Sequence, residues 1–363
     1  MSAERRVFLT GFPGFIGRRL VEKILSKEPG AKVLCLVEPR FELRAREEAR
    51  RLDAGGDRVA ILAGDITAPD LGMDPDAGRD LASRVTDVFH LAAVYDLAVP
   101  EAVARRVNVR GTRHVIEFAR TLKGLRRLVH FSTCYVSGLR TGTIYEDELD
   151  MGQRFKNHYE STKHDSEYLV RQAMREMDAI VIRPSVVVGD SRTGETQKFD
   201  GPYFGMILID TLRRLRVPLP YLGPSRAEIN IVPVDYIVDG TVALWQKEGV
   251  AGSTFALADS RPMTSRELYA QIVRGLGALG PLGAVPPLLV DVPLRIPHVR
   301  RLLGVPREVL EYFNHPAHYD CSRALAALEG TGVACPDLRS YLPAVLDYYV
   351  RNRDRRELRW EAV

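Results

Sequence analysis

Short apolar runs alternate with helical patterns through the first half of this chain, and that alternation limits the folds open to it. The runs expected to form strands are 6–10, 32–37, 58–63, 87–92, 125–132 and 179–183. Apolar residues recur between them at helical spacing, as in 15–27, 99–121 and 158–177. Continuous apolar strands separated by helices predict an α/β fold, in which a doubly wound parallel sheet is covered on both faces.

A glycine-rich segment follows the first of these strands and opens the first helix. It consists of Thr10, Gly11, Phe12, Pro13, Gly14, Phe15, Ile16 and Gly17. Gly11 permits a tight turn, Gly14 lets the backbone approach a pyrophosphate, and Gly17 lets the helix pack closely on the sheet. Free amides at the helix start then bind the phosphates. We expect all eight residues to contact a dinucleotide in a Rossmann-like fold; the alternative is a turn that uses glycine only for packing.

The pattern loosens after Pro184. The stretch 191–201 is polar and predicts a loop, and 228–232 predicts a further strand. From residue 262 onward, mostly helical patterns are interrupted by proline and glycine. We expect residues 1–190 to form the dinucleotide-binding domain, with sheet and helix contributions from about 228–258. Residues 191–363 are then a smaller, mostly helical region that binds substrate and acts as a lid.

The end of the second strand bears on which dinucleotide binds. Glu38 stands where an acid would bind the adenosine ribose and favour NAD(H). Arg40 and Arg44 follow at once and can hold a 2′-phosphate. The alternative for 40–51 is a solvated helix with charge pairs four residues apart. The two arginines favour NADP(H), with NAD(H) left open.

Two further strand ends are expected at the cofactor. Asp65 and Ile66 follow the third strand, where a carboxylate can accept a hydrogen bond from the adenine amine. The fourth strand ends in Leu91, Ala92 and Ala93. Small side chains there leave room for a cofactor. We expect the preceding His90 to be a strand residue near the cofactor rather than a catalyst.

A tyrosine and a lysine share one face of a predicted helix. Tyr159 and Lys163 are four residues apart. A phenol has an ordinary pKa near 10, and a nearby ammonium lowers it. Such a tyrosine can give a proton to a carbonyl oxygen as a hydride reaches the carbon. Ser132 and Thr133 end the fifth strand, and either hydroxyl can donate a hydrogen bond to that oxygen.

These segments together resemble the extended short-chain dehydrogenase/reductase family over about residues 5–260. The matching segments are TGFPGFIG, GDIT, HLAA, NVRGT, FSTCYVSG, YESTK and Arg183-Pro184. The resemblance implies that Tyr159 is the proton donor and that Lys163 also holds the nicotinamide ribose. It places Thr133, rather than Ser132, at the position that orients the substrate.

The same resemblance implies roles for three more residues. Asn108 matches a helix asparagine that supports the active site. Pro184 and Val186 match positions beside the nicotinamide. We therefore include all three among the candidate site residues.

Four segments are similar to the fatty acyl-CoA reductase (male-sterility) branch and to the N-terminal region of bacterial fatty alcohol-forming reductases. They are 90–96, 183–189, 193–203 and 229–236. This similarity implies reduction of a long-chain acyl-CoA or other acyl thioester to an aldehyde, of a fatty aldehyde to an alcohol, or both. Three alternatives stay open: a 3β-hydroxysteroid-type dehydrogenase, a nucleotide-sugar epimerase or dehydratase, and a non-enzymatic NADP(H)-sensing regulator.

The substrate side is less specific. Residues 275–299 are rich in Leu, Val, Gly and Pro, which fits either a core strip or an apolar wall for an acyl chain. The charge run 351–359 fits the solvated end of a helix, or attraction to anionic lipid or to CoA phosphates.

Charge and composition bear on the remaining partners. Lys+Arg (51) and Asp+Glu (47) nearly balance to a net charge of +4, so we expect no nucleic-acid partner. The four cysteines lie far apart without a CxxC pair, which predicts reduced thiols in a cytoplasmic protein and no metal site. No stretch predicts a transmembrane segment, while peripheral membrane contact and a homodimer stay open.

Overall fold

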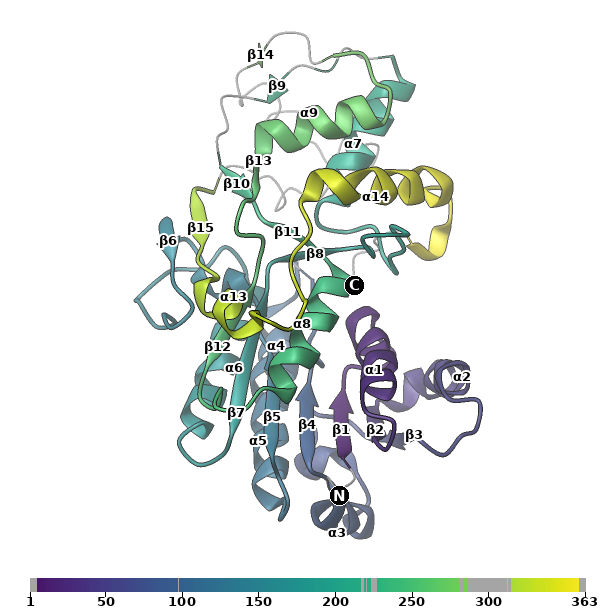
Figure 1. Ribbon diagram of the computed structural model, residues 1–363, viewed down its shortest axis with the longest axis vertical. Coiled ribbons are helices and arrows are strands. Elements are labelled where there is room, and N and C mark those ends of the chain that lie inside the picture. The colour runs from purple at the N-terminus through teal and green to yellow at the C-terminus, as the bar shows by residue number, and fades with distance from the viewer. Residues whose placement is uncertain are drawn as a thin grey trace.

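A seven-stranded parallel sheet forms the centre of the molecule (Figure 1). The computed structural model describes residues 5–96, 98–216, 219, 221–222, 227–280, 284–285, 312 and 315–358. The strands are β1 (Arg6–Thr10), β2 (Lys32–Val37), β3 (Val59–Ala63), β4 (Asp87–His90), β5 (Arg127–Phe131), β7 (Ala179–Pro184) and β12 (Thr254–Leu257). Their order across the sheet is β12-β7-β5-β4-β1-β2-β3, and all neighbours run parallel.

Strand β1 shows why the sheet is covered on both faces. Val7 and Leu9 point into one hydrophobic core, whereas Phe8, between them, points into another. All three side chains are fully buried. The strand order reverses between β1 and β4, and ligands of open α/β sheets bind at such a switch point. The predicted Rossmann-like, doubly wound fold is confirmed.

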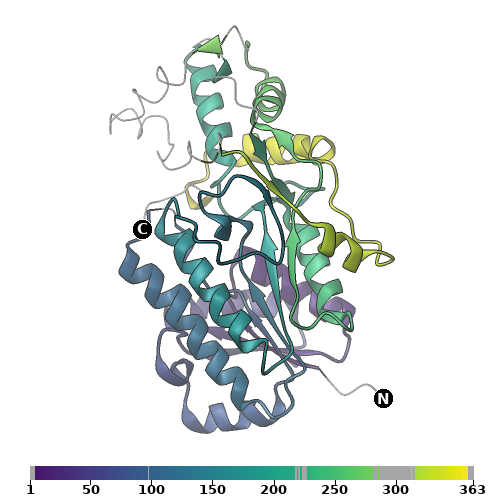
Figure 2. The same ribbon diagram turned by 90° about the vertical axis from the view of Figure 1, so that its left-hand side faces the viewer.

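Helices pack against each face. One face is covered by α1 (Phe15–Lys27), α2 (Glu42–Leu52), α8 (Val234–Gln246) and α13 (Ser322–Leu328). The other is covered by α3 (Pro75–Arg84), α5 (Gly111–Thr121) and α6 (His158–Ala173). Helices α5 and α6 lie side by side in front of the sheet in Figure 2.

A separate hydrophobic core lies beyond the carboxyl ends of the strands, toward the top of Figure 1. Its helices are α7 (Tyr203–Arg214), α9 (Ser265–Gly275) and α14 (Leu338–Asn352), followed by the turn η6 (Arg356–Leu358). The described residues also form short strand pairs outside the main sheet. They are β8 (Val186–Val188) with β11 (Ile231–Pro233), β10 (Glu228–Ile229) with β13 (Met263–Thr264), β9 (Tyr221–Leu222) with β14 (Ala284–Val285), and β6 (Gly142–Ile144) with β15 (Ala317–Tyr319). Short helical turns are η1 (Pro39–Phe41), η2 (Pro69–Gly72), α4 (Glu101–Ala104), η3 (Arg105–Arg110) and η4 (Cys134–Ser137).

Two predicted elements are divided in the structure. The helix expected over 99–121 consists of α4, the π-helical turn η3 and α5. The strand expected near 228–232 is split at Asn230, because its side chain exchanges hydrogen bonds with the Asp259 backbone at 2.8 and 2.9 Å. On either side of Asn230, β10 therefore pairs with β13 and β11 with β8.

Some expectations for the second half remain predictions. Most of the apolar stretch 275–299 lies outside the described residues. The division at residue 190 also stays a prediction, although β12 joins the main sheet as the contribution from 228–258 requires. Across the described ranges, no helix has the length and apolar character needed to cross a membrane.

Candidate functional site

The glycine turn lies at the switch point of the sheet, where only glycine fits. Gly11 has a φ of +94°, and a Cβ there would come within 2.9 Å of the Ala92 amide nitrogen. A Cβ on Gly14 or Gly17 would meet the Gly11 carbonyl oxygen at 2.8 or 2.5 Å. The backbone therefore forms a close turn at the start of α1, where the free amides of a helix are suited to bind an anion.

Thr10 and His90 connect β1 to β4 beneath this turn. The Thr10 hydroxyl lies 2.8 Å from Nδ1 of His90, and Nε2 of His90 lies 2.9 Å from the Thr112 hydroxyl. Burial, with a smaller effect of Lys163, lowers the pKa of His90 to about 3, so the ring is neutral. Both ring nitrogens are thus engaged, one by β1 and the other by α5, which gives His90 a structural position.

One cavity of about 960 Å³ opens along the carboxyl ends of the strands. Fourteen of its lining residues are among those predicted from the sequence: Gly11, Gly14, Phe15, Ile16, Gly17, Leu91, Ala92, Ala93, Ser132, Thr133, Pro184 and Val186, together with Tyr159 and Lys163 from α6. The cavity therefore joins the glycine turn to the Tyr–Lys pair.

Helix α6 presents Tyr159 and Lys163 to the cavity. The Asn157 side chain caps the helix by accepting a hydrogen bond from the Glu160 amide at 3.0 Å. Lys163 Nζ donates to the Phe131 carbonyl at 2.6 Å, which holds the ammonium at the end of β5. Thr133 caps η4 through the Tyr135 amide at 3.3 Å, and its hydroxyl is also hydrogen-bonded to Tyr159.

The pKa values of this pair differ from the simple expectation. Burial raises the pKa of Tyr159, Glu160 adds to the rise, and the Thr133 hydrogen bond acts against it. The expected lowering by Lys163 is therefore outweighed by desolvation of the phenolate. Burial also lowers the pKa of Lys163 to about 8, with Glu167 acting in the opposite direction. Tyr159 thus holds its proton at neutral pH.

The hydroxyl of Ser132 is hydrogen-bonded to a buried protein side chain, although the residue lines the cavity. Its hydroxyl donates to Glu167 at 2.6 Å, and Glu167 also accepts from Arg183 at 2.7 Å and from Arg171 at 2.9 Å. Glu167 is fully buried. Because its hydroxyl is engaged in this cluster, Ser132 is less suited than Thr133 to donate to a substrate oxygen.

Asn108 supports the site from η3 without lining the cavity. Its side-chain oxygen accepts from the Val94 amide at 2.9 Å, and its nitrogen donates to the Thr162 hydroxyl at 3.0 Å. Thr162 precedes Lys163, so Asn108 connects the segment after β4 to the helix that carries the Tyr–Lys pair. Its geometry is that of a positioning residue.

Three residues at the end of β1 and in the glycine turn lie outside the cavity wall. Thr10 is engaged with His90, and Phe12 is buried in the core beneath α1. Pro13 is also buried. Their side chains are buried in the protein and do not line the pocket.

Arg40, Asp65 and Ile66 also lie outside it. Arg40 is 71 % exposed and forms an ion pair with Glu38 at 2.6 Å, whereas Arg44 lines the cavity. Asp65 accepts hydrogen bonds from the Thr67 amide and hydroxyl at 2.8 and 2.9 Å, so its carboxylate is engaged locally. Ile66 packs in the core on the α5 side.

Other lining residues were missed by the sequence reading. They are Tyr95, Phe131, Tyr135, Ser185, Val187, Glu195, Thr196, Gln197, Lys198, Asp200, Gly201, Tyr348, Arg355, Glu357 and Leu358. Tyr95 meets the Tyr159 ring edge-on at 5.0 Å between centroids. Burial raises the pKa of Asp200 to about 6. The stretch 193–203 is similar to the reductase branch as a segment, but no spacing within it indicates which of its residues line a pocket.

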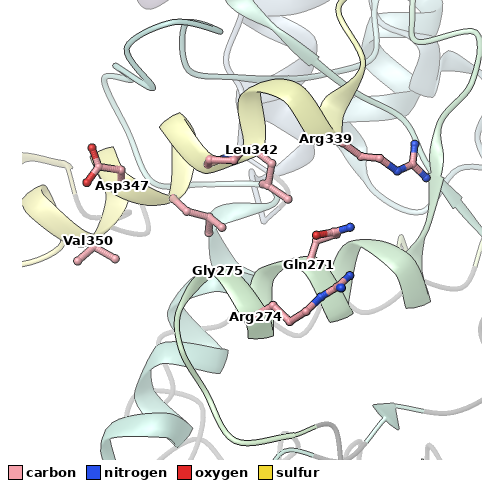
Figure 3. Close-up of a pocket in the computed structure, with 9 residues that line it drawn as sticks. Gln271, Arg274, Gly275, Arg339, Leu342, Asp347 and Val350 are labelled. Atoms are coloured by element: carbon pink, nitrogen blue, oxygen red, sulfur yellow. The ribbon is translucent and has the colours of Figure 1, made fainter.

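A second pocket of about 550 Å³ lies between α9 and α14 (Figure 3). Gln271 and Arg274 contribute to it from α9, and Leu342, Asp347 and Val350 from α14. None of the sequence-predicted site residues lines it. Within the described ranges, no group of three or more His, Cys, Asp or Glu side chains is arranged to hold a metal ion.

Comparison with known proteins agrees with this geometry. Residues 9–241 match the NAD-binding family model described as "Male sterility protein". The chain is similar to the putative fatty acyl-CoA reductase CG8303 of Drosophila melanogaster, with 25 % identity over 284 residues, 67 % of this chain and 52 % of that protein. It is also similar to the glycine betaine reductase ATRR of Emericella nidulans, with 28 % identity over 75 % of this chain and 22 % of that protein. The chain thus spans about half the length of the first relative and less of the second.

A solved structure resembles almost the whole chain. The terminal R domain from the myxalamid PKS-NRPS biosynthetic pathway superposes with a TM-score of 0.82 at 25 % identity. The alignment covers 98 % of this chain and 93 % of that domain. The similarity therefore extends beyond the nucleotide-binding sheet into the region that follows residue 190.

Proposed function

We propose that this chain, which belongs to the NAD-binding family described as male sterility protein, reduces an acyl thioester to an aldehyde with NADPH. The single observation that carries the proposal is the shared cavity: the glycine turn, Thr133, Tyr159 and Lys163 all line it. A dinucleotide and a carbonyl substrate can therefore meet beside one proton donor. The expected membership of the extended short-chain dehydrogenase/reductase family is confirmed by the family match.

The glycine turn fits a dinucleotide because a Cβ at Gly11 or Gly14 would clash with the neighbouring backbone, so the turn carries no side chain at these two positions. NAD(P) binding follows from the family, and the preference for NADPH is part of the proposal. Arg44 on the cavity wall supports it as the cation for a 2′-phosphate. Arg40 is not needed for that role, because it pairs with Glu38 outside the cavity.

The reaction assigns one task to each of three side chains. When bound, the reduced nicotinamide supplies a hydride to the carbonyl carbon. Tyr159, which burial keeps protonated, gives its proton to the carbonyl oxygen, and Thr133 donates a hydrogen bond to the same oxygen. Lys163, held at the Phe131 carbonyl, places its positive charge beside the phenolate that forms. A thioester substrate yields a thiohemiacetal, which collapses to the aldehyde and the free thiol.

The names of the relatives guide the choice of substrate. A fatty acyl-CoA reductase points to a long-chain acyl-CoA, and we propose this thioester as the first substrate. Reduction of a fatty aldehyde to an alcohol uses the same three side chains and is proposed as a second step.

A polar acyl thioester is a second candidate. Gln197, Lys198 and Asp200 line the cavity and offer hydrogen bonds or charge that an alkyl chain cannot use. These side chains favour an acyl group that carries polar atoms.

The test combines purified protein, NADPH and either palmitoyl-CoA or a short, polar acyl-CoA. NADPH oxidation and free-thiol release are followed together with each substrate. At least one substrate should release one thiol per NADPH if reduction stops at the aldehyde, or one thiol per two NADPH if the aldehyde is reduced further. Tyr159→Phe should lower kcat by about 100-fold or more while the Kd for NADPH stays unchanged. NADPH binding without thiol release from either substrate would contradict thioester reduction and move the test to free aldehydes.

A further inference from the structure

The turn at the end of the described chain belongs to the same cavity as the glycine turn. Arg355, Glu357 and Leu358 line it together with Gly11 and Gly14, although more than 300 positions separate them in the sequence. The sequence analysis left this charge run as a solvated helix end or a site for lipid or CoA phosphates. Its position beside a dinucleotide-binding turn assigns it another role.

The turn is held in place by the loop that precedes α7. The Phe199 amide donates to the Leu358 carbonyl at 2.7 Å, and the Tyr348 hydroxyl donates to the Thr196 carbonyl at 3.3 Å. The Leu358 side chain is buried in the same core as Phe199 and Tyr349. The backbone of η6 is therefore attached to this loop rather than free in solvent.

The loop is in turn attached to the first turns of α1. Arg18 pairs with Glu195 at 3.3 Å, and Arg19 pairs with Glu195 at 3.2 Å and with Asp190 at 3.5 Å. Arg355 lies near this loop, because Arg355, Glu195 and Tyr348 all line the same cavity. The turn η6 thus lines the same cavity as the start of α1, whose free amides are suited to bind phosphates.

The arginines in this region differ in how easily they can exchange their carboxylate partner for a ligand. Arg18 and Arg19 hold the loop through Glu195 and Asp190. Arg355 pairs with Glu357 at 2.7 Å, and both side chains are more than half exposed. Such an exposed pair contributes little stability. Arg355 can therefore exchange a carboxylate for phosphate oxygens at small cost, and a guanidinium matches phosphate geometry well.

We propose that Arg355 binds the pyrophosphate of the dinucleotide, so that η6 forms a wall of the cofactor site. The pyrophosphate is favoured over the 2′-phosphate because the residues near Arg355 connect to α1, whereas Arg44 lies on α2 after the second strand. The proposal rests on dinucleotide binding and not on the reductase reaction. Binding titrations therefore test it separately from turnover.

Fluorescence titration of the full chain with NADPH and with NADH tests this assignment. Arg355→Ala should raise the Kd for both dinucleotides by a similar factor, about five- to tenfold. Glu357→Gln should lower both Kd values, because it removes the carboxylate that competes for Arg355. A purely structural role for the turn would not produce these opposite effects.

Arg351→Ala is the matched control. Arg351 is an exposed arginine on α14 that pairs with Asp347 at 2.6 Å and does not line the cavity. Its removal should leave both Kd values unchanged, and circular dichroism should show all three variants folded. Unchanged binding in Arg355→Ala would overturn the proposal. A loss confined to NADPH would also overturn it, since that result assigns Arg355 to the 2′-phosphate.

Discussion

Lys163 illustrates how single residues set the chemistry of this site. Burial lowers its pKa to about 8, and Glu167, one helical turn further along α6, opposes that change. His90 on β4 and His130 on β5 lie close enough for the positive charge of Lys163 to act on them. Burial is the main cause that lowers the pKa of both rings, and Lys163 is the second, so both rings are neutral. Tyr159 lies four residues before Lys163 on α6, and both side chains line the cavity. The carboxylate of Glu167 is therefore the charge that keeps Lys163 protonated.

We expect Glu167→Gln to move the alkaline limb of the kcat–pH profile to lower pH. Lys163 acts as an ammonium, so activity falls as pH rises through its pKa, and loss of the nearby carboxylate lowers that pKa further. The measurement is kcat from pH 6 to 10.

Ser132→Ala is the matched control for that experiment. It breaks the 2.6 Å hydrogen bond to Glu167 but keeps the carboxylate charge, so the alkaline limb of the kcat–pH profile should stay at the same pH as in the wild type. An equal shift in both variants, or no shift in folded Glu167→Gln, would refute the electrostatic role.

At the scale of elements, buried side chains attach separate segments to one another. Glu146, 1 % exposed, accepts hydrogen bonds from the Ala256 amide of β12 at 2.7 Å. It also accepts from the Arg323 and Ala324 amides at 2.6 and 3.2 Å, at the start of α13. One carboxylate thus joins the segment after β6, the edge of the sheet and a late helix. Such a contact cannot be read from the local pattern of any of the three segments.

Glu146 should make folding stability depend on pH. Burial raises its pKa from 4.5 to about 7, so the folded chain binds this proton more tightly than the unfolded chain. Its contribution to the free energy of unfolding is full below pH 4.5 and is lost as pH rises through 7. Urea denaturation between pH 4.5 and 7.5 should show a flatter dependence in Glu146→Gln than in the wild type.

Asp147→Asn provides the comparison for that series. Asp147 is 56 % exposed and pairs with the exposed Arg323 side chain. Its loss should leave the pH dependence as in the wild type. A Glu146→Gln curve parallel to the wild-type curve would show that Glu146 does not titrate in this range.

At the scale of the whole molecule, the cavity is assembled from segments that are distant in the chain. The glycine turn, the ends of β5 and β7, helix α6 and the turn η6 all contribute to its wall. The unfolded chain has no such cavity. A dinucleotide that binds there should therefore stabilise the entire fold.

We expect NADPH to raise the melting temperature. At a concentration 100 times its Kd, the ligand should add about 2.7 kcal/mol to the free energy of unfolding. Differential scanning fluorimetry with increasing NADPH measures the shift. In Gly14→Val the shift should vanish, because even a Cβ at this position would lie 2.8 Å from the Gly11 carbonyl oxygen. Equal shifts in both proteins would place the dinucleotide elsewhere.

The sequence alone determined the central sheet and the local geometry of its strand ends. Alternating apolar strands and helices predict a parallel sheet, and the glycine turn and the four-residue spacing of Tyr159 and Lys163 are local properties of backbone and helix. Only the tertiary structure decided that Arg44 rather than Arg40 lines the cavity, that Ser132 is hydrogen-bonded to Glu167, and that Arg355 lines the same cavity as the glycine turn. These outcomes depend on side-chain partners far away in the chain, and no local periodicity encodes which distant segments meet at the end of a sheet.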